Sequence, residues 1–161
     1  MDGLKTILAG GLAQRFEELA ARVREIAAPL SEEQFWKKPF AFGNSFGHLT
    51  LHVTGNLNYY IGAQMANTGY VRDRPREFTE GDRPAKEEVL ARFAAAVELV
   101  VRTIRAQSES DWGITYTAKG EEDAENRLNI VLRCLTHLDH HVGQMQYLGF
   151  SATSGLSQRI R

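Results

Sequence analysis

The chain has 161 residues, of which 43% are hydrophobic and 24% charged, with a formal net charge of −1. This length and composition predict a single domain spanning residues 1–161, large enough to bury a core without disulfides. The near-neutral charge argues against a general electrostatic affinity for nucleic acid or an anionic membrane. The single cysteine, Cys134, excludes an intrachain disulfide, and the sequence has neither a secretory signal nor a membrane span, so we expect a cytoplasmic protein.

The N-terminal third of the chain begins with a strong helical pattern. Apolar residues recur every three, four or seven positions over residues 4–26, and Pro29 is expected to end this first helix. Ser31 with Gln34 resembles a capping box and predicts a further helical turn. In the connector that follows, we expect the aromatic residues to pack over one end of the core: Trp36, Phe40 and Phe42.

The second helix is predicted to begin after Asn44 or Ser45, since either is a good N-cap, and to run to about Asn67. The polar stretch of residues 70–82 is predicted to be an irregular crossover loop. We expect its aromatic and aliphatic residues to anchor it and its mixed charges to form local ion pairs.

Two more helices complete the predicted set. The third is expected from about Asp82, with Pro84 in its first turn, to about Ser108. Residues 112–117 alternate in a short extended pattern, and a fourth helix is expected over residues 124–148, with Gly149 at its C-cap. Four amphipathic helices with one long crossover, between the second and the third, predict an all-α four-helix bundle.

All five histidines fall in the second and fourth predicted helices: His48, His52, His137, His140 and His141. His137 and His141 are four residues apart, so they project from one helix face and are the strongest candidates to bind one ion. His48 and His52 repeat this spacing. Spacing alone does not choose between His48 and His52, or between His140 and His141, and hydrogen-bonded histidines beside a core are the simpler alternative.

A histidine site would favour zinc, nickel, copper or iron, and three neutral imidazoles would leave positions open for water or substrate. Cys134 is a further candidate ligand or, more commonly, a core residue. Gln144 and Asp139 are candidates to orient the imidazoles. The sequence shows no P-loop, no dinucleotide fingerprint and no Glu-x-x-His motif of di-iron bundles, so a mononuclear site is expected.

Residues 137–144, with two histidines four apart followed by a Gly-Gln pair, resemble the fourth-helix signature of the DinB-like, or YfiT-like, metal-dependent hydrolases. Residues 44–57, with His52 before a Gly-Asn segment, resemble the second-helix signature of that family. The loop of residues 72–78 is similar to one found in a subset of its members. The resemblance covers most of the chain, because the helix order and the long crossover also agree.

This resemblance implies an up-down-down-up bundle, homodimers, and a metal site made by His52, His137 and His141, with zinc or nickel as the favoured ion. It also implies a metal-dependent thiol transferase or hydrolase that activates a thiol or water for a small-molecule substrate. The sequence contains no obvious general base, although His48 is a candidate because of its proximity. One alternative is a non-catalytic metal-binding or small-ligand-binding stress-response protein. Another is a bundle that acts only through contacts with partner proteins.

Overall fold

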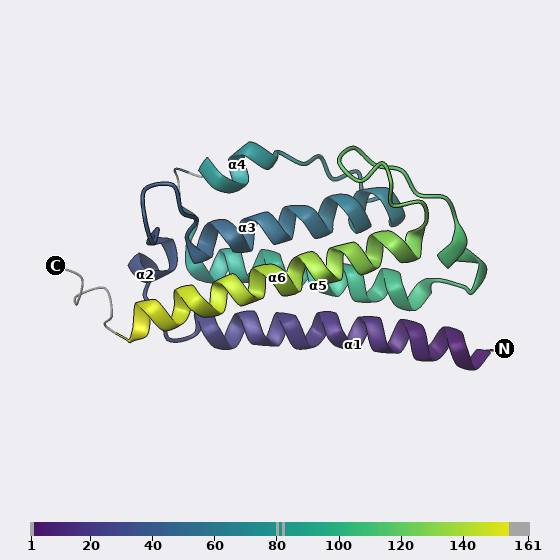
Figure 1. The fold of residues 1–161 in the computed structure, drawn as a ribbon, viewed down its shortest axis with the longest axis horizontal. Coiled ribbons are helices and arrows are strands. Elements are labelled where there is room, and N and C mark those ends of the chain that lie inside the picture. Colours follow the sequence, from purple (N-terminus) through teal and green to yellow (C-terminus); the bar gives the residue numbers. More distant parts are fainter. Residues whose placement is uncertain (1, 80, 82, 155–161) are drawn as a thin grey trace.

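The computed structural model describes residues 2–79, 81 and 83–154. Its long helices are α1 (Asp2–Ala27), α3 (Phe46–Leu57), α5 (Lys86–Ala106) and α6 (Arg127–Thr153). In Figure 1, α1 and α6 run in one direction, whereas α3 and α5 run in the other. This arrangement is the expected up-down-down-up bundle, and the described residues contain no β-strand.

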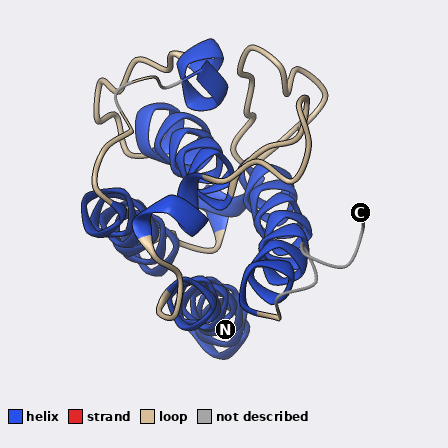
Figure 2. Ribbon diagram, turned by 90° about the vertical axis from the view of Figure 1, so that its left-hand side faces the viewer, coloured by secondary structure: helices blue, strands red, loops and turns tan. Residues whose placement is uncertain are grey.

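The view along their axes shows the long helices arranged around a common centre (Figure 2), and their buried apolar side chains form one core. Both α1 and α3 pack against α5 and α6, so each of the four has two long neighbours. The largest side chains that are fully buried come from all of these helices and from the segments that adjoin them: Phe16, Phe35, Phe46, Leu57, Ile61, Ile104, Ile130, Leu138 and Met145. None of the described helices is both apolar enough and long enough to cross a membrane.

The connection after α1 confirms one prediction and corrects another. Ser31 and Gln34 form the predicted capping box, which starts the short helix α2 (Glu32–Trp36). Trp36 is buried, but Phe40 and Phe42 are 60% and 90% exposed, so the expectation that they cover the core was wrong. Phe35, Trp36 and Phe46 already close that end of the core, and the rings of Phe40 and Phe42 contact each other instead.

Helix α3 begins after Ser45, whose side chain accepts a hydrogen bond from the backbone N–H of His48. The helix was expected to run to about Asn67, and helical backbone does continue to Met65. Part of this continuation is a π-helical segment, Asn58–Ala63. Insertions of this kind often adjoin functional sites, because the extra residue changes the direction of the following side chains.

The crossover contains a short helix that was not predicted, α4 (Arg74–Thr79), which packs outside the bundle against α3 (Figure 2). Phe78 anchors it, with its ring 4.8 Å from that of His52, whereas Val71 is 87% exposed and anchors nothing. The expected local ion pair is present between Arg72 and Glu77, and it is buried.

The last two long helices begin later than predicted. Helix α5 starts at Lys86 because Arg83, with a φ of 42°, and Pro84 precede it in non-helical conformations; the predicted start at Asp82 lies outside the described residues. The 3₁₀ turn Ser110–Gly113 and a single bridge between Thr115 and Asn126 replace the expected extended segment.

Helix α6 starts after Asn126, whose side chain accepts from the backbone N–H of Asn129, and it continues past Gly149. Gly149 is therefore not the predicted C-cap. It is buried where α6 meets α1, and a Cβ there would overlap the side chain of Ile26. This glycine permits close packing of the two helices.

Candidate metal centre

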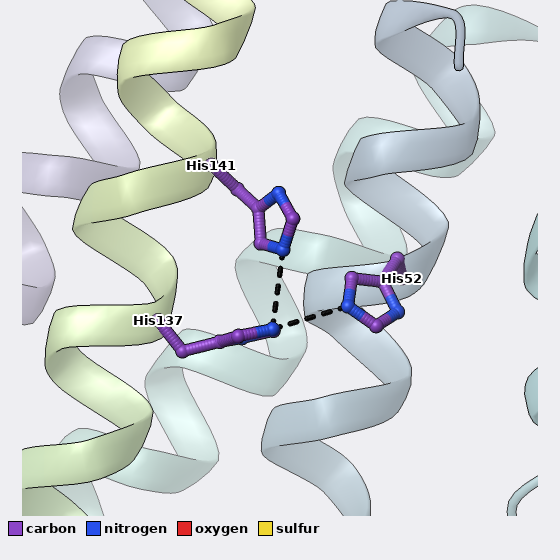
Figure 3. Close-up of side chains that lie close together, drawn as sticks. All are labelled: His52, His137 and His141. Carbon is purple, nitrogen blue, oxygen red and sulfur yellow. Dashed lines mark hydrogen bonds between the residues drawn. The ribbon is translucent and has the colours of Figure 1, made fainter. Parts of the chain in front are cut away.

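Three imidazoles meet between α3 and α6. Figure 3 shows His52 projecting from α3 toward His137 and His141, which project from α6. Nε2 of His137 lies 3.1 Å from Nε2 of His52 and 3.1 Å from Nε2 of His141. One nitrogen atom from each ring lies within 4.8 Å of the others, so the structure brings together the three histidines that the family resemblance implied as ligands.

The packing of α6 explains how its two histidines reach this position. Leu138 and Val142 follow His137 and His141 in the sequence and are buried in the core. Because successive helical residues are turned by about 100°, the preceding histidines emerge beside the core face, one turn apart. They are therefore partly buried and directed toward α3.

A buried ion pair between Arg72 and Glu77 contacts the Nδ1 side of the His52 ring. Nδ1 of His52 lies 2.8 Å from Oε2 of Glu77, and Arg72 donates to both carboxylate oxygens, from Nε at 2.6 Å and from Nη2 at 2.9 Å. Burial alone would raise the pKa of Glu77, but the hydrogen bonds from His52 and Arg72 outweigh it and lower the pKa. An ionised carboxylate only accepts, so Nδ1 of His52 carries a proton, and in the neutral ring Nε2 presents its lone pair.

Gln144 plays the corresponding part for His141. Its Oε1 lies 2.8 Å from Nδ1 of His141, and its Nε2 lies 3.2 Å from Nε2 of His140. The amide nitrogen donates to His140, so the amide oxygen faces His141 and accepts its Nδ1–H. Gln144 thus orients an imidazole, as proposed from the sequence. Asp139 does not, because it forms an exposed ion pair with Arg15.

Counting protons shows that the cluster suits a cation. His52 and His141 both direct lone pairs toward Nε2 of His137, which can donate at most one hydrogen and lies 3.1 Å from each. When all three rings are neutral, at least one of these contacts therefore brings two lone pairs together. A metal ion among the three nitrogens would remove this repulsion. Nδ1 of His137 is buried and has no hydrogen-bond partner.

The surroundings of His137 and His141 favour the neutral form of both rings. Burial, followed by the nearby His141 and His52, lowers the pKa of His137 from 6.5 to about 3. Burial also lowers the pKa of His141, against the opposing effect of its bond to Gln144. Both rings are therefore unprotonated at neutral pH, which is the form that binds metal.

The other candidate residues lie apart from this cluster of ligand atoms. His48 is buried, with Nδ1 2.7 Å from Oγ of Ser45 and its ring against Trp36, so it packs within the bundle; a role as general base stays a prediction. Cys134 is also buried, and burial raises the pKa of its thiol. It behaves as a core residue.

Sequence reasoning assigned no role to Glu77 or Arg72. Both belong to the crossover, where the mixed charges were interpreted only as a local ion pair. The contact with His52 spans 25 residues and has no periodic signal. The only hint was that residues 72–78 resembled a loop found in some DinB-like proteins.

One comparison with known proteins gives a match: the model of the DinB superfamily matches residues 15–145, which include all three clustered histidines and the crossover. No curated protein and no solved structure matches the chain.

Proposed function

The chain belongs to the DinB superfamily, and from this membership and the histidine cluster we propose that it binds one divalent metal ion through His52, His137 and His141. The main support for the proposal is that three Nε2 atoms converge. When the rings are neutral, these atoms carry too few hydrogens for every contact between them to be a hydrogen bond. Imidazole ligands favour zinc or nickel over magnesium or calcium.

We propose further that the protein is a thiol transferase or a hydrolase. When bound, the metal would lower the pKa of a coordinating thiol or water and so supply a nucleophile at neutral pH. The three histidines leave coordination positions open, as a catalytic site requires. They carry no negative charge, and Arg72 balances the charge of Glu77, so the residues around the site favour an anionic ligand such as a thiolate.

The metal content of purified protein tests the binding proposal. Protein prepared without chelators or affinity metals, then loaded with zinc or nickel, is expected to hold one ion per chain by elemental analysis. The His137→Ala variant should hold none, because two imidazoles remain. Asp139→Ala, which removes an exposed polar side chain from the same helix but outside the histidine cluster, should still hold one. Equal metal content in wild type and His137→Ala would refute the assignment.

Turnover by the loaded protein tests the chemistry. We expect product from a low-molecular-weight thiol with an electrophile, or from simple esters and amides, and loss of that product in His137→Ala. Stoichiometric metal with no turnover over this panel would instead favour a metal-binding or small-ligand-binding protein.

A further inference from the structure

We propose that Glu77 is a positioning residue that fixes the tautomer and orientation of His52 for metal binding. Arg72 holds the carboxylate of Glu77 in place, and Gly55 leaves the space that this carboxylate occupies. This inference rests on the proposed metal site. It assigns the crossover between α3 and α5 a direct part in that site, although the three proposed ligands all lie on the bundle helices.

Both carboxylate oxygens of Glu77 accept hydrogen bonds. Oε1 accepts from Nε of Arg72, while Oε2 accepts from Nη2 of Arg72 and from Nδ1 of His52. The side chains of His52, Glu77 and Arg72 are only 6%, 7% and 9% exposed, so water does not compete freely for these bonds. Imidazole ligands of metals commonly donate their second N–H to a carboxylate, which sets the tautomer and raises ligand basicity.

Gly55 is the residue that lets the carboxylate approach α3. It lies three residues after His52 in that helix, and a Cβ there would overlap Oε1 of Glu77 and lie 2.9 Å from Cδ. Glycine is a poor residue for a helix interior, because it loses the most backbone freedom on folding. Its presence is explained by the space that the carboxylate needs.

Residues 72–78 hold His52 on more than one side. Phe78 places its ring 4.8 Å from the imidazole, and the guanidinium of Arg72 lies 5.7 Å from the ring centre of Tyr60 in the π-helical segment. Arg72 therefore contacts the bundle independently of Glu77, and this contact supports the position of the Arg72–Glu77 pair beside His52.

The Glu77→Gln variant tests the role of the carboxylate. Arg72 will attract the single amide oxygen, which leaves the amide NH₂ facing Nδ1 of His52 and favours the tautomer with the proton on Nε2. We expect the Kd for zinc to rise about 10-fold to 100-fold. In metal-free protein, the ¹⁵N NMR signals of His52 should change from the Nδ1–H to the Nε2–H pattern, which a merely structural role would not produce.

Glu88→Gln is the matched control, since Glu88 is a half-exposed carboxylate on α5 that also pairs with an arginine, Arg92. It should keep the wild-type Kd for zinc and the wild-type His52 signals.

Gly55→Ala gives a second test, because it is expected to favour helix formation but to weaken zinc binding. Alanine improves the intrinsic helix propensity of α3, yet its Cβ should displace Glu77 and raise the Kd for zinc. Gly11→Ala is the control, because Gly11 lies in α1 with nothing within 4 Å of an added Cβ. It should raise the melting temperature and leave zinc binding unchanged.

The outcomes separate the two proposals. If wild type binds no zinc, the proposed function fails, but the His52 signals of metal-free wild type and Glu77→Gln still test the tautomer assignment. The inference is wrong if wild type binds zinc, both Glu77→Gln and Gly55→Ala bind zinc with a Kd within twofold of the wild-type value, and their His52 signals are unchanged. Should Glu77→Gln not fold, Gly55→Ala decides.

Discussion

His141 donates a hydrogen bond from Nδ1 to Oε1 of Gln144, 2.8 Å away on the same exposed edge of α6. The bond directs the lone pair of Nε2 toward the other two histidines. We predict that Gln144→Leu, which removes the acceptor but keeps the size of the side chain, raises the Kd for zinc by about tenfold. That is the lower end of the range for residues that orient ligands, because this bond is exposed to water.

Competition with a chromogenic chelator measures this change. The control is Gln14→Leu, since Gln14 is an exposed helical glutamine that bonds to Glu18 and not to a histidine. Its Kd for zinc should equal that of wild type. An unchanged Kd in Gln144→Leu would show that the bond does not orient His141 for binding.

The two histidines of α3 should respond differently to substitution. His52→Ala is predicted to abolish tight zinc binding, whereas His48→Ala should retain it and lower the free energy of unfolding by about 1–3 kcal/mol. The reason is that His48 bonds to Ser45 and packs against Trp36, while His52 faces α6. Calorimetric zinc titration and urea denaturation of both variants provide the comparison, and loss of zinc by His48→Ala would contradict it.

The sequence predicted the bundle and the clustered histidines because both depend on regular spacing. The apolar periodicity of α5 and α6 reports which face is buried, and the separation of His137 and His141 places both on one face. The choice of His52 over His48 required the family resemblance, since the two differ only by one helical turn.

The parts that sequence reasoning missed depend on contacts without a period. Glu77 reaches His52 only because the crossover forms α4 and because Gly55 leaves room for a carboxylate. Phe40 was expected to cover one end of the core because it is aromatic, but the buried side chains of Phe35 and Trp36 already cover that end. Tertiary packing, and not the local sequence pattern, determines whether such residues are buried and which distant residues they contact.

A stability prediction separates the core face of α6 from its histidine face. Leu138 is fully buried and follows His137 directly. Leu138→Ala is predicted to lower the free energy of unfolding by about 2–5 kcal/mol through lost burial and a cavity, while one zinc ion per chain remains. In Leu132→Ala, the control on an exposed part of the same helix, the loss should be about 1 kcal/mol or less. Chemical denaturation measures both; equal losses would refute the assigned orientation of α6.

The low pKa of His137 predicts how the metal-free protein responds to acid. The folded state binds a proton at this site only near pH 3, whereas the unfolded chain does so below about 6.5. Between these values the unfolded state holds more protons, so the free energy of unfolding should fall as the pH is lowered from 6.5 toward 3. Well above pH 6.5, where His137 is unprotonated in both states, its contribution should be constant.

Replacing His137 by leucine should make this fall less steep, because the group that binds the extra proton on unfolding is gone. Thr136→Leu, an exposed and non-titrating neighbour, should keep the wild-type slope. Urea denaturation in the presence of chelator, at several pH values between 7 and 4, measures the three slopes. His141, whose pKa is also lowered, should leave a residual slope in His137→Leu. Parallel curves for wild type and His137→Leu would show that His137 is not held neutral by its surroundings.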